Sequence, residues 1–335
     1  MPANRIPPHN AQPGTNGDAY QASLRLLFGA KPTSLRIRCP RCGRHGLVIT
    51  KWVKGRTVKP VYVLHGGNGH PVKECRLRKG NEESIRTEVD LSAQDLKKLL
   101  ADAKTYVLFS GGGDSLCTLL YLREICGNNG HHLTALHVDT TAGFPEVTAY
   151  VRRICKRLGV PLQIVRPERE YFDLAKKWGI PGFKARWCCK ELKVKPVRDF
   201  LAGVDGAKVV VDGIRAAESF QRSTYMPVWF HPTFRCLSVS PIIRWSDEDV
   251  RTYLKKTGLP QGPAKKFGCS AECWCGAYKK RPDFEKLLEI HPDIFDKLIE
   301  VERAQRGRYT FLYEDGERIP LETLKQSQKG SARLQ

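Results

Sequence analysis

The stretch Phe109–Ser115, "FSGGGDS", follows directly on the apolar run "TYVLF" at residues 105–109. Three consecutive glycines between two serines contribute little to a hydrophobic core, so their small size indicates that something approaches the backbone closely. A loop of this kind between a strand and a helix presents consecutive backbone N–H groups, and the helix dipole adds partial positive charge. The sequence therefore predicts a phosphate-binding loop in which Asp114 orients the loop or holds a magnesium ion.

Apolar strands and amphipathic helices alternate from this loop onward. The strands are predicted at "TYVLF", "LTALHVD", "LQIV" and "KVVVDG". This alternation predicts an α/β fold, a parallel sheet with helices on both faces. Ligands bind beyond the carboxyl ends of such strands, and that is where "SGGGDS", "HVDTTAGFP" and "DGIRAAES" fall.

The motif "SGGGDS" resembles the pyrophosphate loop of the adenine nucleotide α-hydrolase-like enzymes, the PP-loop ATP pyrophosphatases. Over roughly residues 104–278, "HVDTTAGFPEVTAYV", "RWCCKELKVKPVRDFL", "DGIRAAESFQR" and "SVSPIIRWSDEDVRTYL" occur in the order seen in the phosphoadenylyl-sulfate (PAPS) reductase superfamily. The resemblance implies that ATP phosphates bind to Ser110, Gly111, Gly112, Gly113, Asp114 and Ser115. It also implies that Asp139 and Thr140 lie beside the nucleotide, and that Gly213, Arg215 and Arg222 frame the phosphate or sulfur-donor side.

One departure from that family bears on the reaction. Members that reduce PAPS usually have a degraded pyrophosphate loop and a catalytic cysteine near the C-terminus, whereas this chain keeps the loop and has no cysteine after Cys275. We therefore expect ATP activation, in which the guanidinium of Arg215 or Arg222 stabilises the charge of departing pyrophosphate. The alternative for Arg222 is a surface ion pair with Glu218, four residues before it.

Five cysteines lie in "RWCCKELK" and "FGCSAECWCG". Adjacent thiols do not readily chelate one small ion, but they can reach different irons of a cuboidal cluster. The resemblance supports this reading, and the expected [4Fe-4S] ligands are Cys188, Cys189, Cys273 and Cys275. Cys269 is then a spare ligand or a catalytic, sulfur-carrying thiol. Another choice of four, a zinc site and ordinary buried cysteines are the open alternatives.

Residues 31–80 hold thirteen lysines or arginines against the single acid Glu74, which gives this segment a formal charge of +12 out of +21. Such a charge indicates a polyanionic partner, here nucleic acid, or else a surface kept charged for solubility. The same segment contains the knuckle Cys39-x-x-Cys42 and the returning Cys75. These cysteines predict a zinc site completed by His70, with His65 as the alternative. A purely structural cap is the competing role.

The 335 residues divide into six expected parts. We predict a disordered tail at 1–33, a small β zinc ribbon at 34–80, a linker helix at 81–103, a catalytic domain at 104–265, a cysteine motif with helices at 266–305, and a hairpin with a loose tail at 306–335. No apolar run of about 20 residues suits a membrane span, and the first residues have no apolar secretory core, so a cytoplasmic location is expected. In that location the twelve cysteines of the chain are expected to be metal ligands or packing residues and not to form disulfides.

Together these features predict an iron–sulfur enzyme that binds ATP with magnesium, releases pyrophosphate and inserts sulfur into an adenylated tRNA base or DNA phosphate. A sulfur or electron donor protein is an expected further partner. Two other functions fit the same sequence: a PAPS or adenylyl-sulfate reductase that makes sulfite, and a non-catalytic zinc-bearing nucleic-acid-binding module. One scaffold hosts several chemistries, so the fold does not choose among them.

Overall fold

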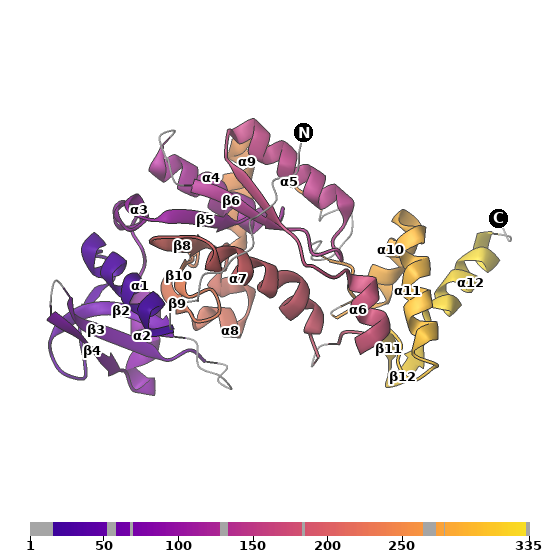
Figure 1. Cartoon of the computed structure of the whole chain (residues 1–335), viewed down its shortest axis with the longest axis horizontal. Coiled ribbons are helices and arrows are strands. Elements are labelled where there is room, and N and C mark those ends of the chain that lie inside the picture. Colours follow the sequence, from indigo (N-terminus) through magenta and orange to yellow (C-terminus); the bar gives the residue numbers. More distant parts are fainter. Residues whose placement is uncertain are drawn as a thin grey trace. The chain divides into compact units, whose positions relative to one another are not determined.

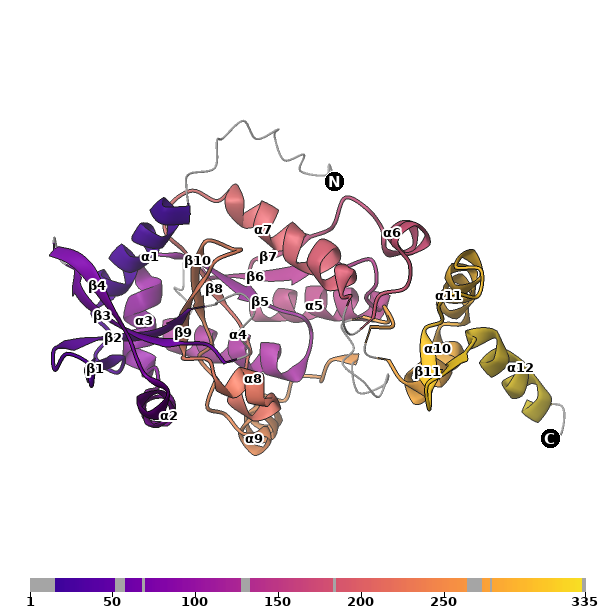
Figure 2. The same ribbon diagram turned by 90° about the horizontal axis from the view of Figure 1, so that it is seen from below.

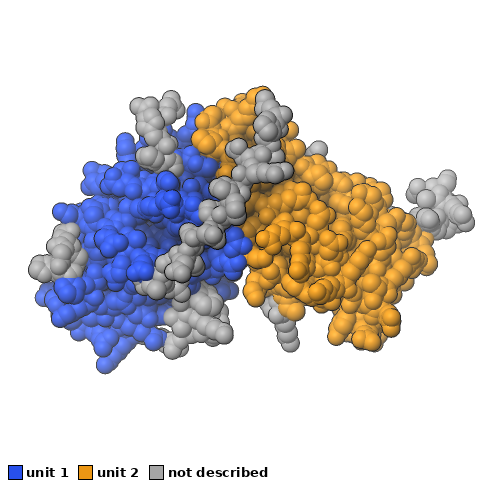
Figure 3. Space-filling model, viewed as in Figure 1, with its two compact units in different colours: residues 1–108, 114–135, 198–259 blue, residues 109–113, 136–197, 260–335 orange. Residues whose placement is uncertain are grey.

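The structure is a computed structural model that describes residues 16–51, 58–67, 70–127, 133–182, 185–263, 273–277 and 279–332. The chain forms two compact units, shown in different colours in Figure 3. The first comprises residues 1–108, 114–135 and 198–259, and the second comprises residues 109–113, 136–197 and 260–335. Within the described residues, no helix is both long and apolar enough to cross a lipid bilayer.

A mixed sheet whose central strands are parallel forms the centre of the first unit. Its strands run in the order β4-β3-β2-β9-β10-β8-β5-β6, and β1 pairs with β2 at one side. The strands are β1 (Arg36–Arg38), β2 (His45–Lys51), β3 (Val61–Gly67), β4 (His70–Arg76), β5 (Lys104–Leu108), β6 (Leu133–Val138), β8 (Lys208–Val211), β9 (Val228–His231) and β10 (Cys236–Val239). β5, β8 and β10 pair in parallel, as do β2 and β9. The predicted α/β fold with a parallel sheet is therefore confirmed.

The N-terminal strands join this sheet instead of forming a ribbon of their own, which corrects the expected separate ribbon at 34–80. Thr50 and Lys51 of β2 pair with Trp229 and Phe230 of β9. The backbone N–H of Met226 also donates to Thr50 Oγ1 at 3.3 Å. The physical reason is that β2 is apolar on both faces, and a segment of this size is too small to bury such a strand alone.

Two expectations for the first hundred residues also change. Residues 16–30 form helix α1 (Asn16–Ala30) rather than a disordered tail, because Leu24, Leu27 and Phe28 are spaced to bury one helix face. Residues 1–15 lie outside the described part of the chain. The single expected linker helix is two helices, α2 (Lys79–Glu88) and α3 (Ala93–Ala101). Ser92 is the N-cap of α3 and accepts the backbone N–H of Asp95 at 3.1 Å.

The other helices of the first unit follow or flank the sheet strands (Figure 1). They are α4 (Gly113–Cys126), the short η2 (Ala216–Glu218), α8 (Phe220–Ser223) and α9 (Asp247–Thr257). Helix α7 (Lys195–Ala202) leads from the second unit into the first.

The second unit contains strand β7 (Leu162–Val165) beside the end of β6, and a mainly helical remainder. Its helices are α5 (Pro145–Leu158), α6 (Tyr171–Trp178), the π-helix η1 (Cys189–Val194), α10 (Arg281–Ile290), α11 (Pro292–Ala304) and α12 (Leu321–Ala332). Figures 1 and 2 both show α10, α11 and α12 side by side. Strands β11 (Leu312–Glu314) and β12 (Glu317–Ile319) form a hairpin at Asp315–Gly316. The loose tail expected after it is wrong for α12, whose Leu321 and Leu324 are buried.

Candidate functional site

The glycine-rich loop joins β5 to α4 along a path that only glycine follows easily. Gly111 has φ = 85°, and a Cβ at this position would lie 3.1 Å from Val147 Cγ1 on α5. Two further contacts shape the loop. The N–H of Gly112 donates to Ser110 Oγ at 3.4 Å, and the N–H of Phe109 donates to the carbonyl of Leu136 on β6 at 3.0 Å. The loop then ends at the N-terminus of α4, where the helix dipole favours an anion.

Two other glycines let backbone pack directly against this loop. A Cβ on Gly213, in the loop after β8, would lie 2.9 Å from the carbonyl carbon of Asp114 and 3.0 Å from the nitrogen of Ser115. A Cβ on Gly262 would lie 2.0 Å from the carbonyl oxygen of Gly111. Gly213 was predicted as a site residue. Gly262 was not, because a glycine in "LPQGPAK" also has the ordinary explanation of a turn.

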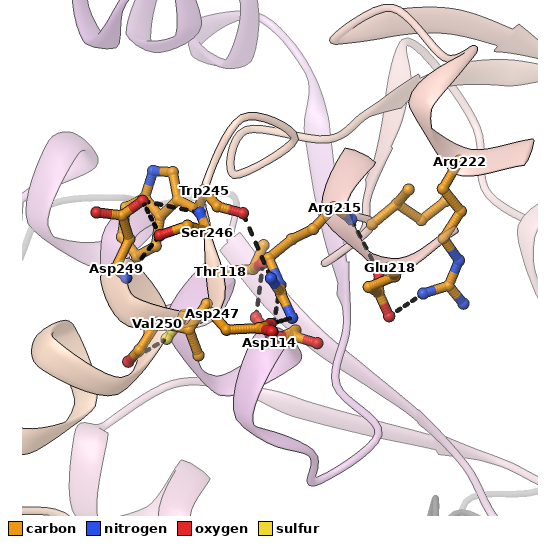
Figure 4. A network of polar contacts seen from close by, with 12 residues as sticks. Asp114, Thr118, Arg215, Glu218, Arg222, Trp245, Ser246, Asp247, Asp249 and Val250 are labelled. Atoms are coloured by element: carbon orange, nitrogen blue, oxygen red, sulfur yellow. Dashed lines mark hydrogen bonds and ion pairs between the residues drawn. The ribbon is translucent and has the colours of Figure 1, made fainter. Parts of the chain in front are cut away.

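Asp114 is held by Arg215, as Figure 4 shows. Arg215 Nε lies 2.9 Å from Asp114 Oδ1, and its Nη2 lies 2.8 Å from Asp247 Oδ1. Its Nη1 donates to the carbonyl of Trp245 at 3.3 Å. The Arg215 side chain is only 7% exposed, whereas that of Asp114 is 31% exposed. Three acceptors thus engage the buried guanidinium, so Arg215 orients Asp114 at the edge of the loop.

Burial and charge act in opposite directions on this pair. Burial raises the pKa of Asp114, and the hydrogen bond and charge of Arg215 offset only part of that rise. Burial lowers the pKa of Arg215, but its hydrogen bonds to Asp247 and Asp114 outweigh burial and leave that pKa raised. The guanidinium is therefore permanently charged beside a carboxylate that a cation can still reach.

Arg222 forms an ion pair with Glu218, the alternative that the sequence left open (Figure 4). Glu218 also accepts the backbone N–H of Arg215 at 2.9 Å through Oε2. One carboxylate thereby connects the two predicted arginines. The Arg222 side chain is 42% exposed, so it is the more accessible guanidinium of the two.

A buried carboxylate that the sequence analysis missed fixes the loop after β8. Asp212 accepts the hydroxyl of Ser240 at 2.6 Å and that of Ser238 at 3.0 Å, and it accepts the N–H of Ile214 at 3.1 Å. Burial raises the pKa of Asp212 by more than these hydrogen bonds lower it. The signal in the sequence is an acid at the end of an apolar strand, opposite the serines of "SVS". This network fixes the backbone from Asp212 to Ile214, which includes Gly213 and leads to Arg215.

In the second unit, the turn after β6 carries the two residues predicted beside the nucleotide. Asp139 Oδ1 accepts the N–H of Thr141 at 3.1 Å. Thr141 has φ = 55°, a left-handed conformation that is strained for a β-branched residue. Thr140 Oγ1 is buried and has no hydrogen-bond partner among the described residues. A strained turn with an unsatisfied hydroxyl is typical of a place where a ligand binds.

His137 is a buried residue on β6 that the sequence analysis also missed, and its side chain contacts the first residue of the loop. Its Nδ1 lies 2.9 Å from the carbonyl oxygen of Phe109, and its Nε2 lies 3.1 Å from Thr148 Oγ1 on α5. A histidine inside an apolar strand usually reads as a core residue. Its contact with the first residue of the loop comes from strand pairing, which the sequence does not reveal.

Of the four predicted cluster cysteines, Cys188 and Cys275 belong to one apolar core of the second unit, and Cys189 and Cys273 pack against that core. Cys275 Sγ lies 3.6 Å from Cys188 Sγ and 3.4 Å from Cys273 Sγ. Cys189 begins the π-helix η1, and Tyr171 donates its hydroxyl to the carbonyl of Cys275 at 2.8 Å. Hydrogen bonding between the adjacent thiols raises the pKa of Cys188 to about 12 and lowers the pKa of Cys189. Cys269 lies outside the described residues.

A second thiol group lies in the N-terminal strands. Cys39, Cys42, His65 and Cys75 bring their ligand atoms within 4.8 Å of one another, which makes a possible metal-binding group. His65 was the alternative to His70 in the sequence analysis. The side chain of His70 is not among those that the structure describes.

Comparison with known proteins finds a family match for the central part of the chain. Residues 104–269 match the family model "Phosphoadenosine phosphosulfate reductase domain". An uncharacterized protein of Methanocaldococcus jannaschii is 26% identical over 194 residues, which are 57% of this chain and 40% of that protein. Adenosine 5'-phosphosulfate reductase 2 of Bacillus subtilis is 25% identical over 154 residues, 45% of this chain and 62% of that enzyme.

Among solved structures, the phosphoadenylyl-sulfate reductase of Candida auris in a phosphate complex is 19% identical. The match covers 59% of this chain and 96% of that one, with a TM-score of 0.44. The chain spans between 40% and 62% of the length of the two curated relatives named above.

Proposed function

We propose that this chain, whose residues 104–269 form a phosphoadenosine phosphosulfate reductase domain, cleaves ATP to AMP and pyrophosphate in order to activate an oxygen for replacement by sulfur. The observation that carries the proposal is the complete phosphate loop. Gly111 has a left-handed backbone conformation, and a side chain on Gly213 would overlap the backbone of Asp114 and Ser115 in the first turn of α4. A nucleotide that keeps its terminal phosphates is the ligand that such a loop suits best.

Each residue of the loop has a distinct role in this reaction. The loop from Gly111 to Ser115 would bind the β- and γ-phosphates, and Asp114, oriented by Arg215, would hold the magnesium ion that accompanies them. Arg222 stabilises the negative charge that develops on departing pyrophosphate. Asp139 and Thr140 contact the nucleoside, which gives the buried Thr140 hydroxyl a hydrogen-bond partner that the described part of the chain does not supply.

The chemistry balances without a redox step when the sulfur arrives as hydrosulfide. The target oxygen, either the hydroxyl oxygen of the enol form of a base or an ionised phosphate oxygen of DNA, attacks the α-phosphorus. This gives an adenylated target and pyrophosphate, and the enol proton passes to solvent. Hydrosulfide then displaces AMP, so that one C–O or P–O bond is replaced by a bond to sulfur. A donor protein that delivers sulfur at a more oxidised level must also supply electrons.

Cys188, Cys189, Cys273 and Cys275 would hold a [4Fe-4S] cluster. The donor set fits this group, because the thiols are adjacent in an apolar core and Cys275 contacts two of the others. With one thiolate on each iron, such a cluster would pass electrons, and an iron that holds sulfide would require one of the four cysteines not to be a ligand. Cys269 is proposed as a further thiol on the sulfur path.

The proposed sulfur acceptor is nucleic acid, either a tRNA base or a DNA phosphate. Charge in the N-terminal strands supports it: Arg36, Arg38, Arg41, Arg44 and Arg76 are all exposed. The segment's one acid, Glu74, already accepts from Lys51 and from the Tyr20 hydroxyl. A surface of this kind binds phosphate backbones by charge. The zinc ion predicted for these strands takes no part in the sulfur chemistry, and its proposed role is structural.

A sulfite-producing reductase is the second candidate. The relative from Bacillus subtilis, named as an adenosine 5'-phosphosulfate reductase, favours it. In that reaction two electrons from thiols break the bond between sulfur and the phosphosulfate oxygen, which releases sulfite and a nucleotide. The reaction needs no pyrophosphate departure, so the intact loop argues against it.

The deciding experiment is anaerobic turnover of ATP labelled in the α- and γ-phosphates, scored for AMP and pyrophosphate, with no polymer, with bulk tRNA and with duplex DNA. We expect pyrophosphate release that one polymer stimulates, together with sulfur in that polymer. Parallel reactions contain adenylyl sulfate or PAPS with a thiol reductant, and sulfite is measured. Sulfite without pyrophosphate release would establish the reductase instead.

Asp114→Asn is the test variant for turnover, and Gly80→Ala is its matched control. The first removes a carboxylate charge at the loop. The second alters a helical position of α2 where an added Cβ meets nothing within 4 Å. We expect only the first to reduce pyrophosphate release.

A further inference from the structure

The N-terminal strands bring four metal-ligating side chains from three places in the chain to one point. Cys39 and Cys42 lie in the turn between β1 and β2, His65 lies on β3, and Cys75 lies on β4. Their ligand atoms all lie within 4.8 Å of one another, and Cys42 Sγ is 3.4 Å from His65 Nε2. Around a tetrahedral zinc ion with Zn–S bonds of about 2.3 Å, neighbouring ligand atoms are about 3.8 Å apart. The four side chains are thus close to a coordination shell.

His65 is already oriented as a ligand. Its Nδ1 lies 3.0 Å from the carbonyl oxygen of His45, to which it donates, and this leaves Nε2 to accept a metal on the side of the thiols. The residue is 4% exposed, and Cys39 is 1% exposed. A fixed, buried imidazole whose second nitrogen faces a thiol is the arrangement that a metal-ligating histidine needs.

The backbone around these four residues also positions their side chains. Gly43 has φ = 72°, and the turn closes with the N–H of Cys39 donating to the carbonyl of Arg44 at 2.8 Å. A Cβ on Gly46 would lie 2.8 Å from His65 Nδ1, so β2 has no side chain where the imidazole packs. The pairing of β3 with β4 shifts register between His65 and Gly67. Such a bulge reorients a side chain that a regular ladder would place elsewhere.

We infer that Cys39, Cys42, His65 and Cys75 bind one zinc ion that ties the β1–β2 turn to β3 and β4. Three thiolates and one imidazole form the closed donor set of a structural zinc site, and they exclude magnesium and calcium, which take oxygen ligands. The inference concerns a different group of residues from the proposed reaction and does not depend on it. It also assigns the histidine that the sequence left open, His65 rather than His70.

The test is the zinc content of the full-length protein purified anaerobically, measured by plasma mass spectrometry separately from iron. We expect one zinc per chain, and after exchange with Co²⁺ the absorption bands of a tetrahedral thiolate site. Chelator competition then compares His65→Ala with His70→Ala. Removing a ligand should weaken zinc binding by at least about 100-fold, since even partners of ligands are worth 10- to 100-fold. His70→Ala should retain wild-type affinity.

His65→Cys guards against simple misfolding, because a fourth thiolate should restore zinc binding that His65→Ala has lost. Three outcomes would overturn the inference: a wild-type protein that binds neither zinc nor Co²⁺ at this stoichiometry, iron alone in the site, or loss of zinc in His70→Ala with retention in His65→Ala. Loss of ATP turnover has no bearing on the result, because metal content is the readout.

Discussion

Arg215 and Asp114 are in contact at 2.9 Å between Nε and Oδ1, although 101 residues separate them in the chain. The contact joins the segment after β8 to the first turn of α4, where the phosphate loop ends. Because Arg215 also contacts Asp247, one buried guanidinium compensates two carboxylates. Its removal would leave Asp114 without the charge that orients it.

We expect Arg215→Met to lower the free energy of unfolding by about 2 kcal/mol. This is below the range for fully buried pairs, because both carboxylates are partly exposed. It should also reduce pyrophosphate release. Arg222→Met is the matched control for stability: it breaks a more exposed pair and should cost less than about 1 kcal/mol. Urea unfolding of both variants measures the difference, and equal costs would show that Arg215 does not hold the site together.

Gly213→Ala should weaken ATP binding at least about tenfold, because its Cβ would overlap the backbone of Asp114 and Ser115 and push apart the loop and the first turn of α4. Isothermal titration with a non-hydrolysable ATP analogue measures the affinity. In contrast, Gly80→Ala has room for its Cβ and should bind normally. Unchanged affinity in Gly213→Ala would mean that the nucleotide binds elsewhere.

Cys275→Ser should abolish iron binding, because Cys275 contacts both Cys188 and Cys273. Cys155→Ser is the matched control: this thiol is also buried, but burial alone raises its pKa, to about 11, with no other thiol involved. Iron and acid-labile sulfide, measured after anaerobic reconstitution, distinguish the two variants. Full iron content in Cys275→Ser would remove it from the proposed ligand set.

His231 should make stability depend on pH. Burial lowers its pKa to about 4, and its Nδ1 accepts the N–H of Phe234 at 3.2 Å. An unfolded histidine titrates near 6.5, so the unfolded state binds the proton first and stability falls as pH drops from about 6.5 towards 4. Between pH 7 and pH 5 the loss is about 2 kcal/mol.

His231→Asn keeps an acceptor for Phe234 and cannot titrate in this range. Urea unfolding at pH 7 and pH 5 should therefore show a smaller acid loss in the variant. If wild type and variant lose the same stability, His231 is not the source.

The α/β fold was predictable because its evidence is local. Each apolar strand and each amphipathic helix carries its own pattern, and the order of the motifs supplied the rest. A local signal also placed the glycine loop. What the sequence did not reveal depends on long-range pairing: the join between β2 and β9, the contact of His137 with Phe109, and the close approach of Gly262 to Gly111.

The candidate site was predictable in part for the same reason. Asp114 and Gly213 stand out as residue types at strand ends. The choice between His65 and His70 could not be made, since both lie near the β3–β4 turn and only the strand register separates them. Asp212 was missed because an acid at a strand end has many explanations until Ser238 and Ser240 lie against it.

The pairing of β2 with β9 also sets the order of events during synthesis. Thr50 and its partner Met226 are separated by 176 residues. At about 5–20 residues per second, the ribosome delivers the later segment roughly 10–35 s after the earlier one. During that interval β2 is an apolar strand with an exposed edge, which is prone to associate with other chains. Early pairing of β2 with β3, together with the proposed zinc ion that needs only residues 39–75, would shelter one edge of β2 before β9 is made.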